Sequence, residues 1–119
     1  MSKRDFTRVS IPNQVRVTAN GESSLFHAPI NLSREGMHLR SPNPPAKGDE
    51  VRIEILLGDF YTVRAEARVV WREGDVWGAQ FRRIDDLSLE LLKDLIRFHA
   101  MDSDKVEQEF EDHGGGTAA

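Results

Sequence analysis

Two stretches in the middle of the chain alternate apolar and charged residues at every step, and no other feature constrains the fold as strongly. Residues 51–55 read Val-Arg-Ile-Glu-Ile, and residues 63–69 read Val-Arg-Ala-Glu-Ala-Arg-Val. Successive side chains of a strand point to opposite faces, so such a stretch packs one face on a core and turns the other to water. The middle of the chain is therefore predicted to be a half-solvated sheet.

The same alternation, divided by turn signals, extends over most of the chain. Pairs such as Asn20-Gly21 and Gly74-Asp75 are typical of tight turns between strands. Strands are predicted at 13–19, 24–32, 36–41, 50–57, 60–73 and 76–83. Six short antiparallel strands favour a closed or nearly closed β-barrel, because closure removes exposed sheet edges.

After Asp86 the apolar spacing becomes that of an amphipathic helix. Leu92, Ile96 and His99 form one stripe, and a second leucine-rich stripe lies beside it. This helix is predicted to pack on the barrel and close one end. From Asp102 onward the chain is acidic and finishes in a glycine-rich stretch, so residues 102–119 are predicted to be a disordered tail.

The charge distribution restricts the class of ligand. The net charge is −4, which argues against DNA or RNA binding by phosphate neutralisation. Residues 1–16 nevertheless carry four basic residues and one acid (+3), whereas residues 84–112 carry three basic residues and ten acids (−7). This arrangement suits a small anion bound at one place.

Several features that the sequence lacks restrict where the protein is expected to be located and which kinds of site it is expected to carry. No apolar run approaches the roughly 20 residues that a transmembrane helix needs, so no membrane insertion is expected. With no cysteine and no apolar signal segment at its start, the chain is expected to be cytoplasmic. No third ligand has suitable spacing with His27 and His38, so no metal and no cofactor are expected. Nucleophile-elbow and phosphate-loop patterns are missing, so an enzyme is not expected.

Two short motifs carry groups that suit a nucleotide. Arg4 and Arg8 are four residues apart, and guanidinium groups bind phosphate and the guanine edge in bidentate fashion. A solvated basic terminus gives the same pattern. Asn31 and Ser33 offer donors and acceptors for a base edge, and Gly36 permits a positive φ and a close approach. An ordinary turn also favours these three residue types.

Taken together, the two motifs resemble the signature of the PilZ domain family, an RxxxR segment followed by [D/N]xSxxG. Arg4 and Arg8 match the first motif, and Asn31, Ser33 and Gly36 match the second without a gap. The Val-Val-Trp and Gly-Ala-Gln-Phe segments and the leucine-rich helix that follow also look like the end of a PilZ domain. The resemblance covers about residues 3–100.

The resemblance implies a mostly β fold, a six-stranded antiparallel PilZ-type β-barrel with a C-terminal α-helix. Residues 1–12 would form a flexible N-terminal arm, and residues 13–101 the barrel and helix. Trp71 and Trp77 are predicted to fill the barrel core or its mouth, as large rings on strands usually do.

The resemblance also implies that the ligand is cyclic di-GMP. Arg4 and Arg8 would grip phosphate and guanine from the arm, and Asn31 and Ser33 would contact a guanine. Lys3 stands where many members carry a further arginine, and it lacks the planar stacking surface of arginine. The number of ligand molecules bound therefore stays open.

The expected function is that of a receptor whose arm becomes ordered on ligand binding and signals to a partner protein or to a second copy of the chain. The alternative is an adaptor for pili or flagella that keeps the fold and acts without nucleotide. A barrel that binds single-stranded nucleic acid would need a basic groove with several exposed aromatics, and the mixed charges of the strands speak against it.

Overall fold

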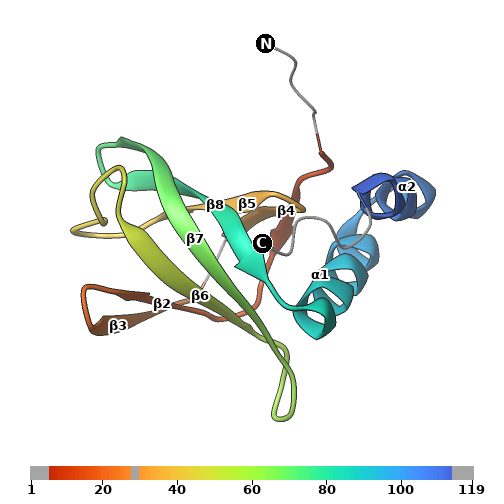
Figure 1. Ribbon diagram of the computed structural model, residues 1–119, viewed down its shortest axis with the longest axis horizontal. Coiled ribbons are helices and arrows are strands. Elements are labelled where there is room, and N and C mark those ends of the chain that lie inside the picture. Colours follow the sequence, from red (N-terminus) through yellow and green to blue (C-terminus); the bar gives the residue numbers. More distant parts are fainter. Residues whose placement is uncertain (1–5, 28–29, 114–119) are drawn as a thin grey trace.

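The computed structural model describes residues 6–27 and 30–113. In this part of the chain, eight strands form one antiparallel sheet, and two helices lie together at one end of it (Figure 1). The strands are β1 (Val9–Ile11), β2 (Val15–Ala19), β3 (Glu22–Phe26), β4 (Ile30–Ser33), β5 (Gly36–Arg40), β6 (Glu50–Leu56), β7 (Thr62–Glu73) and β8 (Val76–Ile84). The helices are α1 (Asp86–His99) and α2 (Ser103–His113).

The sheet is open, which corrects the prediction of a six-stranded barrel. The strand order is β1-β4-β5-β8-β7-β6-β2-β3, so β1 and β3 are its edges, and no pairing between described residues joins them. The single strand predicted at 24–32 is two strands, β3 and β4, which lie near opposite edges. Pro29 stands between them in the sequence, and proline cannot donate a hydrogen bond within a ladder.

The first strand was also missed, because residues 1–12 were assigned to a flexible arm. Val9 and Ile11 are buried and alternate with exposed Ser10, so this short segment has the same one-faced pattern as the longer strands. Burying the two aliphatic side chains stabilises β1 against β4 by roughly 1.5–3 kcal/mol each.

The alternation predicted for the middle strands is confirmed. Val51, Ile53 and Ile55 of β6 are buried, and the residues between them are exposed or half-buried. The register pairs Ile53 with Ala65 of β7 on one side and with Val17 of β2 on the other. Paired residues present their side chains to the same face, so these rows form a continuous apolar inner face.

Helix α1 follows the predicted pattern and covers part of that inner face. Its N-cap residue, Asp85, accepts a hydrogen bond from the Ser88 backbone N–H at 2.7 Å. Leu92 and Ile96 are fully buried. The Ser88 hydroxyl in turn accepts a hydrogen bond from the backbone N–H of Arg64 at 2.9 Å, which ties the start of the helix to β7.

Helix α2 lies in the acidic segment that was predicted to be disordered. Val106 and Phe110, one helical turn apart, are buried and belong to the main core cluster. Glu107 forms ion pairs with Lys93 at 3.6 Å and with Arg97 at 3.3 Å, both on α1. The prediction of disorder was wrong because it rested on the acidic composition of the whole segment, whereas the two apolar residues alone pack the helix on the core. No helix in the two described ranges is long and apolar enough to cross a membrane.

Candidate functional site

The pairing of β1 with β4 brings the N-terminal segment that carries Arg8 next to the motif that contains Asn31 and Ser33. The register places Val9 opposite Leu32 and Ser10 opposite Asn31, so Arg8, one residue before β1, comes close to the end of β4. Arg8 Nη1 donates a hydrogen bond to Ser33 Oγ at 3.1 Å, and Arg8 Nε donates one to Asn31 Oδ1. Three of the residues singled out in the sequence therefore meet, although up to 25 positions separate them.

Ser33 also shapes the turn between β4 and β5. Its hydroxyl accepts a hydrogen bond from the backbone N–H of Glu35 at 3.2 Å, and the residue is fully buried. Such a contact two residues along the chain is typical of a serine that stabilises a turn. The turn-forming role and the contact with Arg8 thus coexist in one side chain.

Gly36 was expected to permit a positive φ, but the structure requires a glycine there for the packing of two strands. Its φ is not positive, unlike that of Gly74 (φ 65°). A Cβ on Gly36 would lie 2.1 Å from the carbonyl oxygen of Ala79 on the adjacent strand β8, a distance that van der Waals repulsion forbids. Glycine is therefore required for β5 to pair with β8.

A row of residues crosses the outer face of the sheet beside this cluster. Asn31 of β4 pairs with His38 of β5, His38 pairs with Gly78 of β8, and Gly78 pairs with Trp71 of β7. Side chains of directly paired residues share a face. The neighbouring Trp77 is fully buried on the inner face, so this row lies on the outer one.

Gly78 allows two rings to meet at the centre of this row. A Cβ there would lie 2.3 Å from Trp71 Nε1 and 2.9 Å from His38 Cδ2. The two rings pack edge to face, with centroids 4.9 Å apart and an interplanar angle of 74°. A glycine inside a strand often marks such a close approach, and this was the signal available in the sequence.

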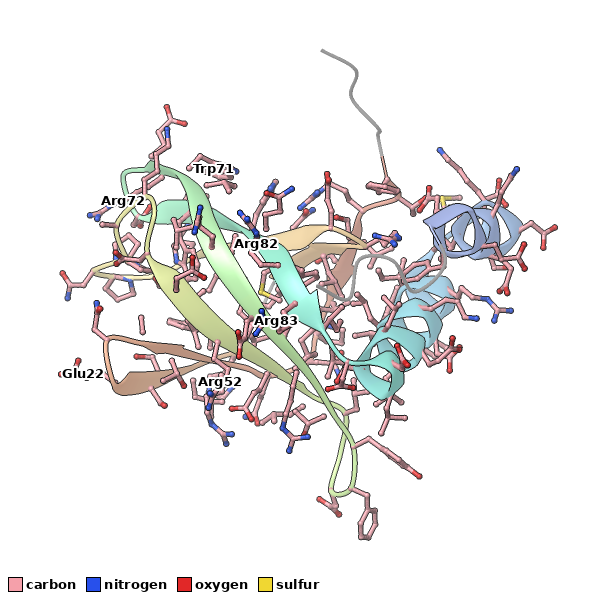
Figure 2. The ribbon with its side chains drawn as sticks, viewed as in Figure 1. Glu22, Arg52, Trp71, Arg72, Arg82 and Arg83 are labelled. Carbon is pink, nitrogen blue, oxygen red and sulfur yellow. The ribbon has the colours of Figure 1, made fainter. Side chains whose placement is uncertain are left out.

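A β-bulge decides which way Trp71 points. Val69 pairs with Ala79 and Trp71 with Gly78, so Val70 is the extra residue on β7. A bulge re-aims the side chain that follows it. Trp71 would continue the inward series of β7 in a regular strand, but it lies half-buried on the outer face (Figure 2).

The prediction that both tryptophans fill the barrel core or its mouth is therefore right for Trp77 and wrong for Trp71. Trp77 is fully buried, and its indole Nε1 donates a hydrogen bond to Ser41 Oγ at 2.9 Å. Trp71 instead lines an outer pocket.

That pocket is open to solvent and has a volume of about 640 Å³. The side chains that line it come from the arm, from the β4–β5 turn and from three strands: Arg8, Glu35, His38, Val70, Trp71 and Gln80. It combines a guanidinium, a carboxylate, an amide and an indole, which suits a flat polar ring that carries an anionic group.

Burial and the charge of Arg8 govern the ionisation of this pocket. Burial lowers the pKa of Arg8, and the carboxylate of Glu35 raises it in part, so the guanidinium remains charged at neutral pH. Burial, and after it the positive charge of Arg8, lowers the pKa of His38 below its usual 6.5. The pocket therefore holds a positively charged guanidinium, that of Arg8, and a histidine, His38, that favours its neutral form.

Arg4 and Lys3, the remaining predicted site residues, lie outside the described residues. The structure brings together Arg8, Asn31 and Ser33, with Gly36 in the adjoining strand. Sequence reasoning did not select Glu35, Gln80, His38 or Trp71 for the site, since only strand register and the bulge place them there.

Comparison with known families and structures gives a consistent result. A sequence model described as the PilZ domain matches residues 2–98. A comparison with curated proteins found no match.

Two solved structures share the fold. One is the structure of the Bacillus subtilis inhibitor of motility, MotI/DgrA, with a TM-score of 0.62 and 16% identity over 93% of this chain. This chain spans about half of that protein, 53% of its length. The other is the PilZ domain of CeSA from a cellulose-synthesizing bacterium, with a TM-score of 0.53 and 21% identity over 78% of this chain and 94% of that one.

Proposed function

Because the chain belongs to the PilZ domain family, we propose that it is a receptor for cyclic di-GMP. The observation that carries this proposal is the contact of Arg8, which lines the outer pocket, with Asn31 and Ser33. Arg8 of the first motif and Gly36 of the second line that pocket, and Asn31 and Ser33 are linked to it by their hydrogen bonds to Arg8.

The chemistry of the pocket supports a guanine dinucleotide. A guanidinium forms paired hydrogen bonds with phosphate oxygens or with guanine O6 and N7, and Arg8 supplies one. The amide of Asn31 reads a base edge, and the half-buried indole of Trp71 offers a face for stacking. In this mechanism Arg4 would close over the ligand from the other end of the arm, and Lys3 would influence how many ligands bind.

The proposed output is a change at the surface beside the arm, which a partner protein or a second copy of the chain would recognise. We place the chain among receptors and adaptors, with no catalytic role. Many proteins switch between two states when a ligand orders a segment of the chain. The ligand can shift the equilibrium between these states only by the difference between its binding free energies for the two.

An adaptor that acts without nucleotide is the second candidate function. One observation favours it: Arg8, Asn31 and Ser33 satisfy one another's hydrogen bonds within the protein itself. The related fold of a protein named an inhibitor of motility is compatible with such a role. In this case the partner would bind equally well with and without cyclic di-GMP.

Isothermal titration calorimetry with cyclic di-GMP tests the receptor proposal. Wild type should bind, and Arg8→Ala should lose about 1–3 kcal/mol of binding free energy or more, since it removes a bidentate contact. Arg52→Ala is the matched control, because Arg52 is an exposed arginine on β6 outside this pocket. An absence of binding by wild type at tens of micromolar ligand would reject the receptor and leave the adaptor. The same titration gives the number of ligands bound.

A further inference from the structure

The acidic helix α2 holds the N-terminal arm directly beside the proposed ligand site. The carboxylate of Glu109 accepts hydrogen bonds from the Thr7 backbone N–H at 3.1 and 3.0 Å and from the Thr7 hydroxyl at 2.8 Å. Thr7 immediately precedes Arg8 and lies within the RxxxR segment. Hydrogen bonds to an ionised carboxylate are among the stronger ones in proteins.

A second contact joins α2 to the other half of the signature. The guanidinium of Arg34 lies 5.5 Å from the ring centroid of Phe6 and 5.5 Å from that of Phe110. Arg34 is buried, and it follows Ser33 in the β4–β5 turn. A cation between two aromatic faces is attracted to both. The arm, the turn and α2 are therefore packed as one unit.

We propose that Glu109 is a positioning residue for the ligand-binding arm, so that docking of α2 and affinity for the ligand strengthen each other. This inference rests on the proposed function. Fixing the backbone of Thr7 fixes the point from which the side chain of Arg8 extends. The arm then loses less conformational freedom when the ligand binds, and reduced ordering cost raises affinity.

The opposite arrangement, in which α2 holds the arm away from the ligand, does not fit the geometry. Arg8 lines the outer pocket while Thr7 is bonded to Glu109, so the docked helix and the pocket position of Arg8 occur together. Coupling between two sites is reciprocal, and the ligand should therefore tighten the docking of α2.

Calorimetry with cyclic di-GMP on four proteins, each comprising residues 1–119, tests this role. Glu109→Ala should weaken binding by about tenfold, within the range typical of coupling between sites. Glu109→Gln keeps an oxygen that accepts from the Thr7 N–H and should recover part of the loss. Glu111→Ala, which removes an exposed acid on the same helix, should bind like wild type.

A double-mutant cycle shows whether the effect passes through Thr7. Thr7→Ala removes the hydroxyl contact, and adding it to Glu109→Ala should cause little further loss of affinity, because the partner is already gone. Independent effects in the two positions would overturn the proposal. Equal binding by wild type and Glu109→Ala, or tighter binding by the variant, would overturn it as well.

Amide hydrogen exchange provides a readout that a purely structural role would not change. Saturating ligand should slow the exchange of α2 amides in wild type, and this slowing should shrink in Glu109→Ala. Unchanged α2 exchange on ligand addition contradicts the coupling. If wild type binds no cyclic di-GMP at all, the receptor proposal itself fails, whereas binding without these effects refutes only the role of Glu109.

Discussion

Arg8 Nη1 donates a hydrogen bond to Ser33 Oγ across 3.1 Å, and this contact joins the arm to the turn between β4 and β5. It depends on the β1–β4 register, which pairs Val9 with Leu32 and so brings Arg8 close to the end of β4. The buried hydroxyl of Ser33 also accepts from the Glu35 N–H. One oxygen therefore fixes both the local turn and the position of the cation in the pocket.

Ser33→Ala should weaken both the fold and the ligand site. Two donors lose their acceptor, so the free energy of unfolding should fall by about 1–3 kcal/mol, since each lost hydrogen bond typically contributes about 0.5–1.5 kcal/mol. The affinity for cyclic di-GMP should also fall, since Arg8 is held less firmly. Urea unfolding and calorimetry measure the two effects. Ser10→Ala is the control, because Ser10 is exposed on β1, and a similar effect there would contradict the specific role of Ser33.

Gly36→Ala should destabilise the protein without any ligand present. The added Cβ would lie 2.1 Å from the Ala79 carbonyl oxygen, so β5 and β8 must separate locally. Overpacking of this kind typically costs about 1–3 kcal/mol. Gly74→Ala, at a turn glycine with φ 65° and open space around it, meets no steric clash and should cost about 1–2 kcal/mol through backbone strain alone. If urea unfolding finds Gly36→Ala as stable as wild type, the packing explanation is wrong.

Trp71→Ala should reduce the affinity for cyclic di-GMP by about 1–3 kcal/mol, the usual contribution of one base stacked on an aromatic ring. Trp71→Phe should lose less, because a smaller ring remains. Ligand should quench tryptophan fluorescence in wild type but not in Trp71→Phe, where buried Trp77 is the only indole left. Full quenching in that variant would place the ligand elsewhere.

His38 should make stability depend on pH on the acidic side of neutrality. Burial and Arg8 lower the pKa of His38 below 6.5 in the folded state, so the unfolded chain binds the proton more readily. The contribution of His38 to the free energy of unfolding is therefore fully present above pH 6.5. It is lost as the pH drops from there through the pKa that His38 has in the folded state.

Urea unfolding at about pH 7.5 and about pH 5.5 measures this contribution, and His38→Gln should reduce the difference between the two. Proton NMR titration of His38 gives its pKa directly, which should rise in Arg8→Ala because one of its two causes is removed. A pKa of His38 at or above 6.5 in wild type would refute the assignment.

Much of the fold could be predicted from local pattern. The alternation around Ile53 predicted one buried face, and the stripe through Leu92 and Ile96 predicted α1. Two elements, β1 and α2, could not be predicted because only a few of their residues show a recognisable pattern. Three residues around Ser10 form β1, and the pair Val106 and Phe110 docks an otherwise acidic helix. Short segments of this kind gain stability only from the surface on which they pack, so their own sequence carries little information.

The sequence by itself determined the alternating strands, the amphipathic helix and the residue types of the proposed binding motif, because each depends on neighbours along the chain. Tertiary structure alone decided that the sheet is open, that the Val70 bulge turns Trp71 outward, and that Glu109 reaches Thr7 across 102 positions. The physical reason is that register, bulges and docking are set by the free energy of contacts between distant segments, and local periodicity does not record which segments will meet.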